Sequence, residues 1–357
     1  MKIKDIFRVT RGSVLAADKV LLSKIDGYEY PVYSSQTKAD GLLGYYNTYL
    51  YENAITWTTD GANAGTVHYR AGKFYCTNVC GVLLNKDGYA NRCTAAILGS
   101  ISKKYVSYVG NPKLMNNIMS EIPIIIPALE EQHKIDSFIA VLDKRIKAQQ
   151  MMITSLKKYK RGLLTYAFEE MTLSDDADST TYHFSEIAQR RKEKYSPDSG
   201  VEYPCIELEH IEQGTGRLLG SVSSTTQSSI KTVARSGDVL FGKLRPYLRK
   251  FAFAEQNIVC SSEIWAFVPS EYVIPKYLYY LVQTEHFLRV ANISSGTKMP
   301  RAEWANIEKE PFDIPCILIQ EKTVSILEAI DKKICTSSDS LRMLMNFREG
   351  LLQQLFI

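Results

Sequence analysis

Two stretches of the chain repeat one pattern: PALEEQHKIDSFIAVLDKRI at residues 127–146 and PCILIQEKTVSILEAIDKKI at residues 315–334. The offset between them is 315 − 127 = 188 residues, and it holds without a gap to GLLTYAF at 162–168 and GLLQQLF at 350–356. A repeat of this length predicts a chain of two related halves, each a variable region followed by a shared segment.

Both shared segments predict long helices. Pro127 closes an extended stretch, and Glu130 and Glu131 fall in the first helical turn, where acidic side chains meet the positive end of the helix dipole. Mostly apolar residues then recur at alternating steps of four and three, the pattern of a coiled-coil seam. The predicted interface residues are Ile135, Ile139, Leu142, Ile146, Gln149, Ile153, Leu156 and Leu163 in the first helix, and Leu327, Ile330, Ile334, Ser337, Leu341, Leu344, Leu351 and Leu355 in the second.

The seam predicts that the two helices pack against each other. Each would have ~39 residues and therefore a length of ~58 Å at 1.5 Å per residue. A seam of that length is hard to bury against a compact domain. The duplication indicates a pseudo-twofold axis, which makes the pair antiparallel. The alternative is that each helix is buried separately in its own globular domain.

Polar residues interrupt the seam twice in each helix, at the same offset. Gln149 matches Ser337, and Lys160 matches Arg348. We expect Gln149 to face Ser337 near the middle of the pair, where a polar pair sets register at some cost in stability.

Gly162 and Gly350 also fall inside the predicted helices, where glycine costs ~1 kcal/mol relative to alanine. A close approach of the helices, or a kink near the end, would explain both glycines. Simple tolerance is the alternative.

The variable regions are rich in Tyr, Val, Ile, Thr and Gly in short alternating stretches, which is typical of β structure. Residues 52–84 predict strands joined by turns at Gly-Ala-Asn and Arg-Ala-Gly, and residues 236–253 predict two strands around an Arg-Pro step. Helices are expected at about 88–107 and, after a proline at the first helical position, at 276–291.

The predicted fold class is therefore α+β, with two mixed, β-rich domains separated by two long helices that form an antiparallel coiled coil. The predicted boundaries are 1–126 for the first domain, 127–169 for the first helix, 170–181 for an acidic linker, 182–314 for the second domain and 315–357 for the second helix.

Composition sets broad limits on the function. A length of 357 residues suits two domains. The net charge of +4 permits an acidic partner without demanding one. No apolar run reaches the ~18 residues of a membrane helix, and the N-terminus lacks the pattern of a signal peptide. Seven cysteines, an odd count, indicate reduced thiols in a cytosol.

The sequence shows little sign of catalytic machinery. It has no G-x-x-x-x-G-K-[ST] phosphate loop and no G-x-G-x-x-G motif, and its five histidines show no H-x-x-x-H spacing. Cys76, Cys80 and Cys93 have the chemistry for three zinc ligands. Residues 74–82 also alternate at period two, which favours the buried face of a strand instead. We expect the aspartates at 175–178 to be solvated charges, so no catalytic residue and no metal site is predicted.

A basic cluster in GKLRPYLRK, residues 242–250, is the strongest candidate for nucleic-acid contact. In an extended chain Lys243, Arg245, Tyr247 and Arg249 lie on one side, and Pro246 favours an extended Arg245. Arginine can bind guanine or a phosphate with two hydrogen bonds.

Further candidates are basic or polar side chains in both variable regions. An ordinary solvated surface is the alternative for each of them. They are Lys250, Arg190, Arg191, Lys192, Lys298 and Arg301 in the second region, and Lys38, Thr58, Thr59, Asp60, Asn63, Tyr69 and Arg70 in the first.

These features together resemble the specificity (S) subunit of a type I restriction–modification system. The motifs that carry the resemblance are IPIIIPALEEQHKIDSFIAVLDKRI, FDIPCILIQEKTVSILEAIDKKI, GLLTYAF, GLLQQLF and GDVLFGKLRPYLRK. The shared layout covers essentially the whole chain, as two target-recognition domains that alternate with two helices.

The resemblance implies a non-catalytic subunit whose two domains each recognise one half of a split site in double-stranded DNA. The coiled coil would set the spacer and dock two methyltransferase (M) subunits, which carry S-adenosylmethionine. Restriction (R) subunits would add ATP- and Mg-dependent cleavage, so this chain itself would bind no cofactor. A cytoplasmic location without membrane contact is implied as well. The alternatives are a stand-alone enzyme, such as a nuclease, and a coiled-coil scaffold whose β domains bind protein.

Overall fold

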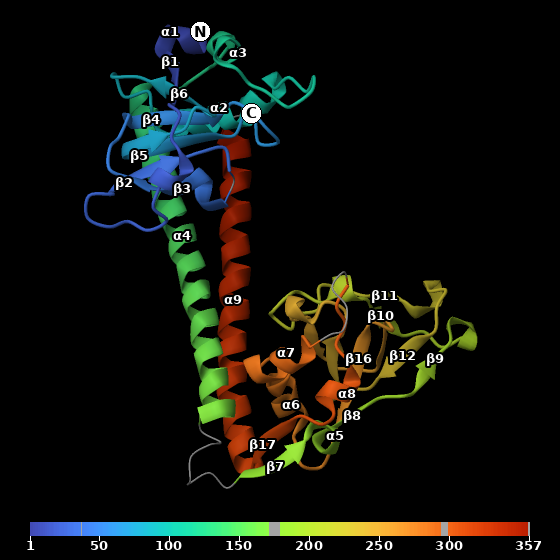
Figure 1. The fold of residues 1–357 in the computed structure, drawn as a ribbon. Helices are drawn as coiled ribbons and strands as arrows, with labels where there is room; N and C mark the ends of the chain where they lie inside the picture. The colour runs from blue at the N-terminus through green and yellow to red at the C-terminus, as the bar shows by residue number, and fades with distance from the viewer. Residues whose placement is uncertain (37, 171–178, 294–298, 356–357) are drawn as a thin grey trace. The chain divides into compact units, whose positions relative to one another are not determined.

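The computed structural model describes residues 1–36, 38–170, 179–293 and 299–355. The chain divides into two compact units. The first is Met1–Met151 together with Asp339–Ile357, and the second is Met152–Ser338. Each unit therefore holds one β-rich domain and a part of both long helices (Figure 1).

The first unit contains a six-stranded sheet in the order β1-β6-β4-β5-β2-β3. Neighbouring strands are antiparallel except β2 and β5, which are parallel. Residues such as Ile3, Trp57, Leu98 and Met119 form one buried core between strands and helices. The elements are β1 (Arg8–Arg11), β2 (Tyr30–Tyr33), β3 (Leu42–Tyr46), β4 (Tyr51–Thr58), β5 (Val67–Cys76), β6 (Cys80–Leu84), α1 (Ile3–Ile6), α2 (Arg92–Ile101) and α3 (Asn116–Glu121).

Among the described residues, the second unit contains two larger sheets, in the orders β11-β10-β15-β12-β9 and β14-β13-β16-β8, and a two-stranded sheet of β17 and β7. Aromatic residues such as Phe241, Phe267, Tyr277 and Phe287 dominate its largest core. The strands are β8 (Ala188–Arg190), β9 (Lys194–Tyr195), β10 (Pro204–Ile206), β11 (Val222–Ser223), β12 (Lys231–Ala234), β13 (Val239–Gly242), β14 (Phe251–Phe253), β15 (Ile258–Cys260) and β16 (Ile264–Pro269). The helices are α5 (Phe184–Ile187), α6 (Pro275–Leu281), α7 (Glu285–Ala291) and α8 (Trp304–Ile307).

The sheets of the two domains share most of their strand pairings, although β9, which pairs with β12, has no counterpart in the first domain. In each, a short early strand pairs with a late strand, β1 with β6 and β8 with β16. Each also has one parallel pair, β2 with β5 and β10 with β15. β4 corresponds to β12 followed by β13, and β5 to β14 followed by β15. The strand pair that carries a register shift between Glu52 and Ala54 in the first domain is broken into two pairs in the second.

The two long helices are α4 (Leu129–Thr165), which continues into a π-helical turn (Tyr166–Glu170), and α9 (Ile317–Leu355). In the first unit Arg348 Nε donates to Asp143 Oδ1 at 2.6 Å. In the second unit Lys160 Nζ lies 2.8 Å from Asp331 Oδ1. From the first ion pair to the second, the residue number rises along α4, from 143 to 160, and falls along α9, from 348 to 331. The helices are therefore antiparallel (Figure 1). The predicted fold class is confirmed, and separate burial of the helices is wrong.

The two ion pairs are copies of each other at the repeat offset, because 143 + 188 = 331 and 160 + 188 = 348. The polar interruptions at Lys160 and Arg348 are thus ion-paired positions. The predicted seam residues from Ile135 to Leu163 and from Leu327 to Leu351 are all buried or half-buried, while Leu355 is 44% exposed. The pairing of Gln149 with Ser337 stays a prediction.

Both long helices begin with the same buried contact. Gln132 and Gln320, which are 188 residues apart, are fully buried. Each donates from Nε2 to the proline carbonyl five residues earlier, at 2.8 and 2.9 Å. Gln132 Oε1 accepts from Asn91 Nδ2 (2.8 Å), and Gln320 Oε1 accepts from the Ile274 N–H (2.9 Å). Asn91 and Ile274 are the N-caps of α2 and α6. The repeated proline-to-helix pattern therefore fixes each long helix to the first turn of a domain helix.

Several local predictions are wrong. The Arg-Ala-Gly sequence forms no turn but lies within β5, where Gly72 adopts φ +71° opposite Asn53 at φ +47°. The helix predicted at about 88–107 begins only at Arg92, because the residues before the Asn91 cap form a loop, and after Ile101 it continues as a 3₁₀ helix, Ser102–Tyr105. The helix predicted at 276–291 is two helices, α6 and α7, because the Thr284 side chain caps a new start by accepting from the Phe287 N–H.

The predicted explanations of Gly162 and Gly350 also change. A Cβ atom at either position would meet nothing within 4 Å, so close approach of the helices does not account for them. β7 (Ser179–His183), which pairs with β17 (Pro311–Pro315), begins inside the stretch predicted as linker. Residues 171–178 of that linker, with its aspartates, lie outside the described residues. Within the described part of the chain, no helix is long and apolar enough to cross a membrane.

Candidate nucleic-acid interface

One hairpin tip recurs in both domains. The loop 59–66 joins β4 to β5, and the loop 243–250 joins β13 to β14. The Gly61 N–H donates to Pro112 O at 3.0 Å, and the Arg245 N–H donates to Pro300 O at 2.8 Å. Since 112 + 188 = 300, each tip is held by the same point of the repeat. Isolated bridges between Asp60 and Lys113 and between Leu244 and Arg301 repeat the arrangement.

The second tip is not an extended chain. Arg245 adopts a left-handed conformation at φ +52°, Pro246 begins a 3₁₀ turn, and Arg249 is left-handed at φ +50°. The extended conformation predicted for Arg245 is therefore wrong. The contact of its N–H with the distant Pro300 carbonyl overrides the local preference before proline. Gly61, the equivalent residue of the first tip, has φ +93°.

The basic side chains of the second tip fall into two groups. Arg249 donates to both carboxylate oxygens of Glu285 at 2.7 Å, and Lys250 donates to Leu208 O at 2.6 Å. Among the described residues, the side chains of Lys243 and Arg245 make no ion pair or hydrogen bond. Arg245 is exposed and Lys243 half-buried.

Tyr247 is 52% exposed beside these two cations. Arg301, on the segment that holds the tip, pairs with Glu263 at 3.1 Å. Lys298 lies outside the described residues. The tip thus presents two cations and one aromatic ring whose side chains make no hydrogen bond or ion pair with the residues that the structure describes.

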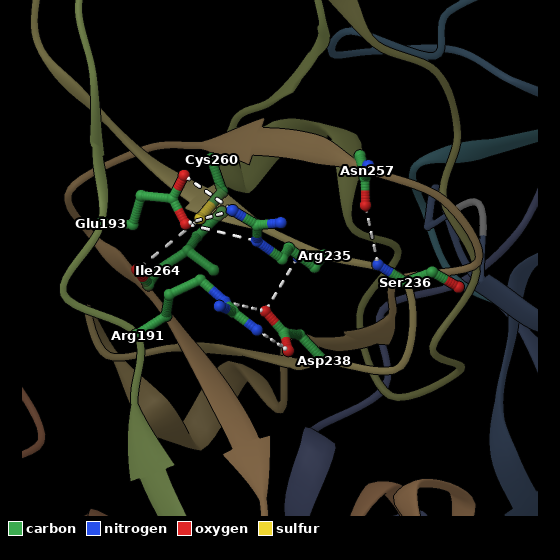
Figure 2. A network of polar contacts seen from close by, with 8 residues as sticks. All are labelled: Arg191, Glu193, Arg235, Ser236, Asp238, Asn257, Cys260 and Ile264. Carbon is green, nitrogen blue, oxygen red and sulfur yellow. Dashed lines mark hydrogen bonds and ion pairs between the residues drawn. The ribbon is translucent and has the colours of Figure 1, made fainter.

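Arg191 stabilises the domain from within (Figure 2). It donates to both oxygens of the buried Asp238, at 2.5 and 2.8 Å, and this hydrogen bonding raises the pKa of Arg191. Asp238 also accepts from the Arg235 N–H, and the Arg235 side chain pairs with Glu193. Arg191 therefore holds the chain between β12 and β13.

The two basic residues that flank Arg191 have different surroundings. The Arg190 guanidinium lies 4.7 Å from the ring centre of Trp304, while Lys192 is exposed.

The first domain has fewer free side chains. Thr58 and Thr59 are buried, and the Thr59 hydroxyl donates to Val79 O at 3.0 Å. Asp60 accepts from the Asn111 amide, and the Tyr69 ring lies 5.2 Å from the Arg92 guanidinium. The backbone of Lys38 begins a short 3₁₀ segment (Lys38–Gly41).

Arg70 is a buried cation in this domain. It is only 7% exposed, and its Nε donates to Thr56 Oγ1 at 3.1 Å. Its guanidinium lies 3.7 Å from the ring centre of Tyr33. Together with Asn63, Thr58 and His68, it lines a cavity of about 150 Å³.

Sequence reasoning named Arg70, Thr58 and Asn63 but missed Thr56, His68 and Tyr33. Thr56 and His68 face each other across the β4–β5 pair. The sequence did contain a signal for two of them: Thr56 and His68 each lie two residues from a predicted site residue, Thr58 and Arg70, and so on the same face of a strand.

The cysteines do not form a zinc site. Cys76 and Cys80 lie in one core cluster and Cys93 in another. Cys76 ends β5 and Cys80 begins β6, so the predicted single strand is in fact two. Burial raises the pKa of Cys80 and of Cys93 to about 11, which disfavours the thiolate that binds metal. No group of three metal-binding side chains gathers among the described residues.

The fold and the tips define a class: a duplicated protein of two β domains and two antiparallel helices. The family model described as the type I restriction modification DNA specificity domain matches residues 1–158 and 179–341. The chain therefore belongs to this family of specificity (S) subunits, which are the non-catalytic subunits of type I restriction enzymes.

Individual proteins agree with this assignment. The type I restriction enzyme MjaVIII specificity subunit of Methanocaldococcus jannaschii is 22% identical over 372 residues, covering 94% of this chain and 86% of that protein. The MpnII specificity subunit of Mycoplasma pneumoniae is 36% identical over 146 residues, 40% of this chain and 43% of that protein. The chain spans about half the length of several curated Mycoplasma relatives.

A solved structure shares the fold. The crystal structure of a type I restriction-modification S subunit from M. genitalium matches with a TM-score of 0.69 at 15% identity, covering 100% of this chain and 95% of that chain.

Proposed function

We propose that each β domain binds one half of a bipartite site in double-stranded DNA, and that α4 and α9 set the spacer between the halves. The observation that carries the proposal is the repeated hairpin tip. Its backbone is held by an equivalent hydrogen bond to a proline carbonyl in both domains, while its side chains differ, with Gly61 in one and Arg245 in the other. A constant frame with unlike side chains suits a reader of two unlike half-sites.

The second tip supplies the best-supported contacts. Lys243, Arg245 and Tyr247 carry the DNA interface there, because their side chains make no hydrogen bond or ion pair with the described residues. An arginine can bind guanine with two hydrogen bonds in the major groove. Lys192 and Arg190 add cations for the phosphate backbone, which supplies much of the affinity of any such protein. Arg249, Lys250 and Arg301 shape the tip through their internal contacts.

In the first domain the proposed contacts lie around the equivalent loop, with Asn63, Thr58 and Arg70 as the central residues. Asparagine can bind adenine through two hydrogen bonds.

The partners follow from the family. The helices would dock two methyltransferase (M) subunits, which carry S-adenosylmethionine, and restriction (R) subunits would bring ATP and Mg. The exposed apolar side chains of Phe138 and Val141 on α4, and of Ile326 and Met343 on α9, are available for such docking. The complex would act on DNA in the cytoplasm.

Methylation mapping tests the proposal. The chain would be co-purified with a methyltransferase subunit, and the methylated bases in exposed DNA would be sequenced. We expect one split motif, methylated in both halves only when this chain is present. Methylation that is indifferent to this chain would contradict the proposal and favour a coiled-coil scaffold.

A further inference from the structure

The cavity of the first domain contains a buried positive charge, Arg70, that no carboxylate of the described residues meets at ion-pair distance; the Asp40 charge acts on it from farther away. Arg70 is 93% buried, and among the described residues no carboxylate forms an ion pair with it. The described residues that line the cavity include neither aspartate nor glutamate. Buried charges in proteins are normally paired, because an unpaired one loses its hydration without compensation.

The fold holds the guanidinium in one position despite this cost. Thr56 Oγ1 accepts from Nε, and the Tyr33 ring stacks on the guanidinium. The backbone of Gly41 closes from a third side, since a Cβ there would lie 3.3 Å from a terminal nitrogen of Arg70. Such pre-positioning is what a binding residue needs, and a merely tolerated charge would not require it.

The rest of the lining offers hydrogen-bond donors. The Thr58 hydroxyl and the Asn63 amide have no hydrogen bond among the described residues, and both can donate. His68 is neutral at physiological pH, because burial and the nearby Arg70 charge lower its pKa to about 4. Among the described residues that line the cavity, Arg70 is therefore the one positive charge.

The size of the cavity limits the ligand. A cavity of about 150 Å³ is about half the ~300 Å³ at which pockets for drug-sized molecules start. We propose that the cavity binds one singly charged oxyanion, a phosphodiester group of the DNA held by the first domain, through the Arg70 guanidinium. This inference rests on the proposed DNA binding of that domain. Free inorganic phosphate could make the same contacts, and the test below distinguishes it from a phosphodiester group of DNA.

The first arm uses inorganic phosphate alone. The melting temperature of the full chain is measured in phosphate and in chloride at equal ionic strength. We expect a phosphate-specific rise, because a ligand bound only by the folded state stabilises it. Arg70→Met should abolish the rise without lowering the melting temperature in chloride, since it removes an unpaired buried charge. Arg8→Met, an exposed arginine of the same domain, is the matched control and should keep the rise.

Thr56→Val provides a second variant in case Arg70→Met does not fold. It removes the acceptor that holds Nε and should weaken phosphate binding at least tenfold. A wild-type chain without a phosphate-specific rise, or an Arg70→Met chain that retains it, overturns the proposal.

The second arm identifies the source of the oxyanion. Binding of the complex with its methyltransferase subunits is measured on DNA that carries one uncharged methylphosphonate at a time. We expect one position in the first half-site to lose about tenfold in affinity for the wild type and nothing for Arg70→Met. A phosphate-specific rise without such a position supports the oxyanion site with free phosphate as its ligand. If removal of one base, but of no phosphate charge, weakens binding, the cavity holds a base and the proposal is wrong. If the rise occurs but the complex shows no sequence preference, the proposed function fails while the oxyanion site stands.

Discussion

The two copies of the interhelical ion pair should differ in strength, although the repeat relates them. Lys160 and Asp331 have side chains only 11% and 27% exposed, whereas Arg348 and Asp143 are 37% and 40% exposed. Lys160 also donates to Gln283 Oε1 at 2.9 Å. Burial lowers the pKa of Lys160, and the Asp331 charge opposes this effect.

We therefore expect Asp331→Asn to destabilise the second unit by about 2–3 kcal/mol. Loss of one partner of a buried pair costs ~3–5 kcal/mol, and here Gln283 still solvates the ammonium group in part. Asp143→Asn should cost the first unit only ~0.2–1 kcal/mol, as for exposed pairs. Hydrogen exchange followed by mass spectrometry reads each unit separately. Peptides around Lys160 and Asp331 should open about 30- to 160-fold more often in Asp331→Asn.

The control replaces both partners. Lys160→Met combined with Asp331→Leu should recover part of the lost stability, because an apolar pair of similar volume removes the uncompensated charge. The recovery is incomplete because the Tyr280 hydroxyl, which donates to Asp331 Oδ2 at 3.0 Å, loses that acceptor. Equal losses in Asp331→Asn and Asp143→Asn would refute the argument from burial. So would a double variant as unstable as Asp331→Asn alone.

Three further predictions concern single positions. His68 has a pKa of about 4 in the folded protein, against an ordinary value near 6.5. Between these two pH values the unfolded state binds a proton at His68 that the folded state does not bind. The folded state therefore loses stability as the pH falls from 6.5 toward 4. The first unit should lose about 2 kcal/mol between pH 7.5 and pH 5 from this group, and His68→Gln should flatten that part of a melting-temperature profile. Gly162→Ala and Gly350→Ala should each stabilise the helices by ~0.5–1 kcal/mol, because a Cβ atom would meet nothing within 4 Å at either site. Thermal melting measures the effect, and a loss of stability would show that the space beside the glycine is occupied. Arg245→Ala and Arg245→Gly should both reduce the preference for one base of the second half-site by ~1–3 kcal/mol, as measured by DNA binding with single-base variants. The glycine variant should be the more stable protein of the two, because the φ of residue 245 is +52°. Equal weakening of binding to all DNA sequences would mean that Arg245 contacts a phosphate instead.

The long helices could be predicted from the sequence because their signal is local. A seam with a period of 3.5 residues is visible within one segment, and the repeat fixes its partner and direction. The roles of Lys160 and Arg348 were less visible. Each breaks the apolar pattern, and only pairing with an aspartate of the other helix explains why a charge is tolerated there.

The candidate site was harder to predict because its geometry depends on distant contacts. The preference of a residue before proline is a local rule, yet Arg245 takes its conformation from a hydrogen bond to Pro300, 55 residues away (300 − 245). From its sequence context Arg191 is a candidate DNA-binding cation, but the fold pairs its side chain with Asp238. The sequence shows that such side chains are basic, but it does not show which of them the fold has already neutralised.

The repeated contacts explain how two domains can share a frame and still differ in what they bind. The frame consists of main-chain hydrogen bonds at the tips and of the buried Gln132 and Gln320 at the helix starts. At the tip, the hydrogen bond to the proline carbonyl requires only a backbone N–H, which every residue except proline supplies. The side chain at that position is therefore free to change while the backbone stays. Glycine at 61 and arginine at 245 are two such choices, both at positive φ (+93° and +52°), and arginine is present at 245 although glycine would be less strained there. That strain is the kind expected where a side chain is retained for binding and not for stability.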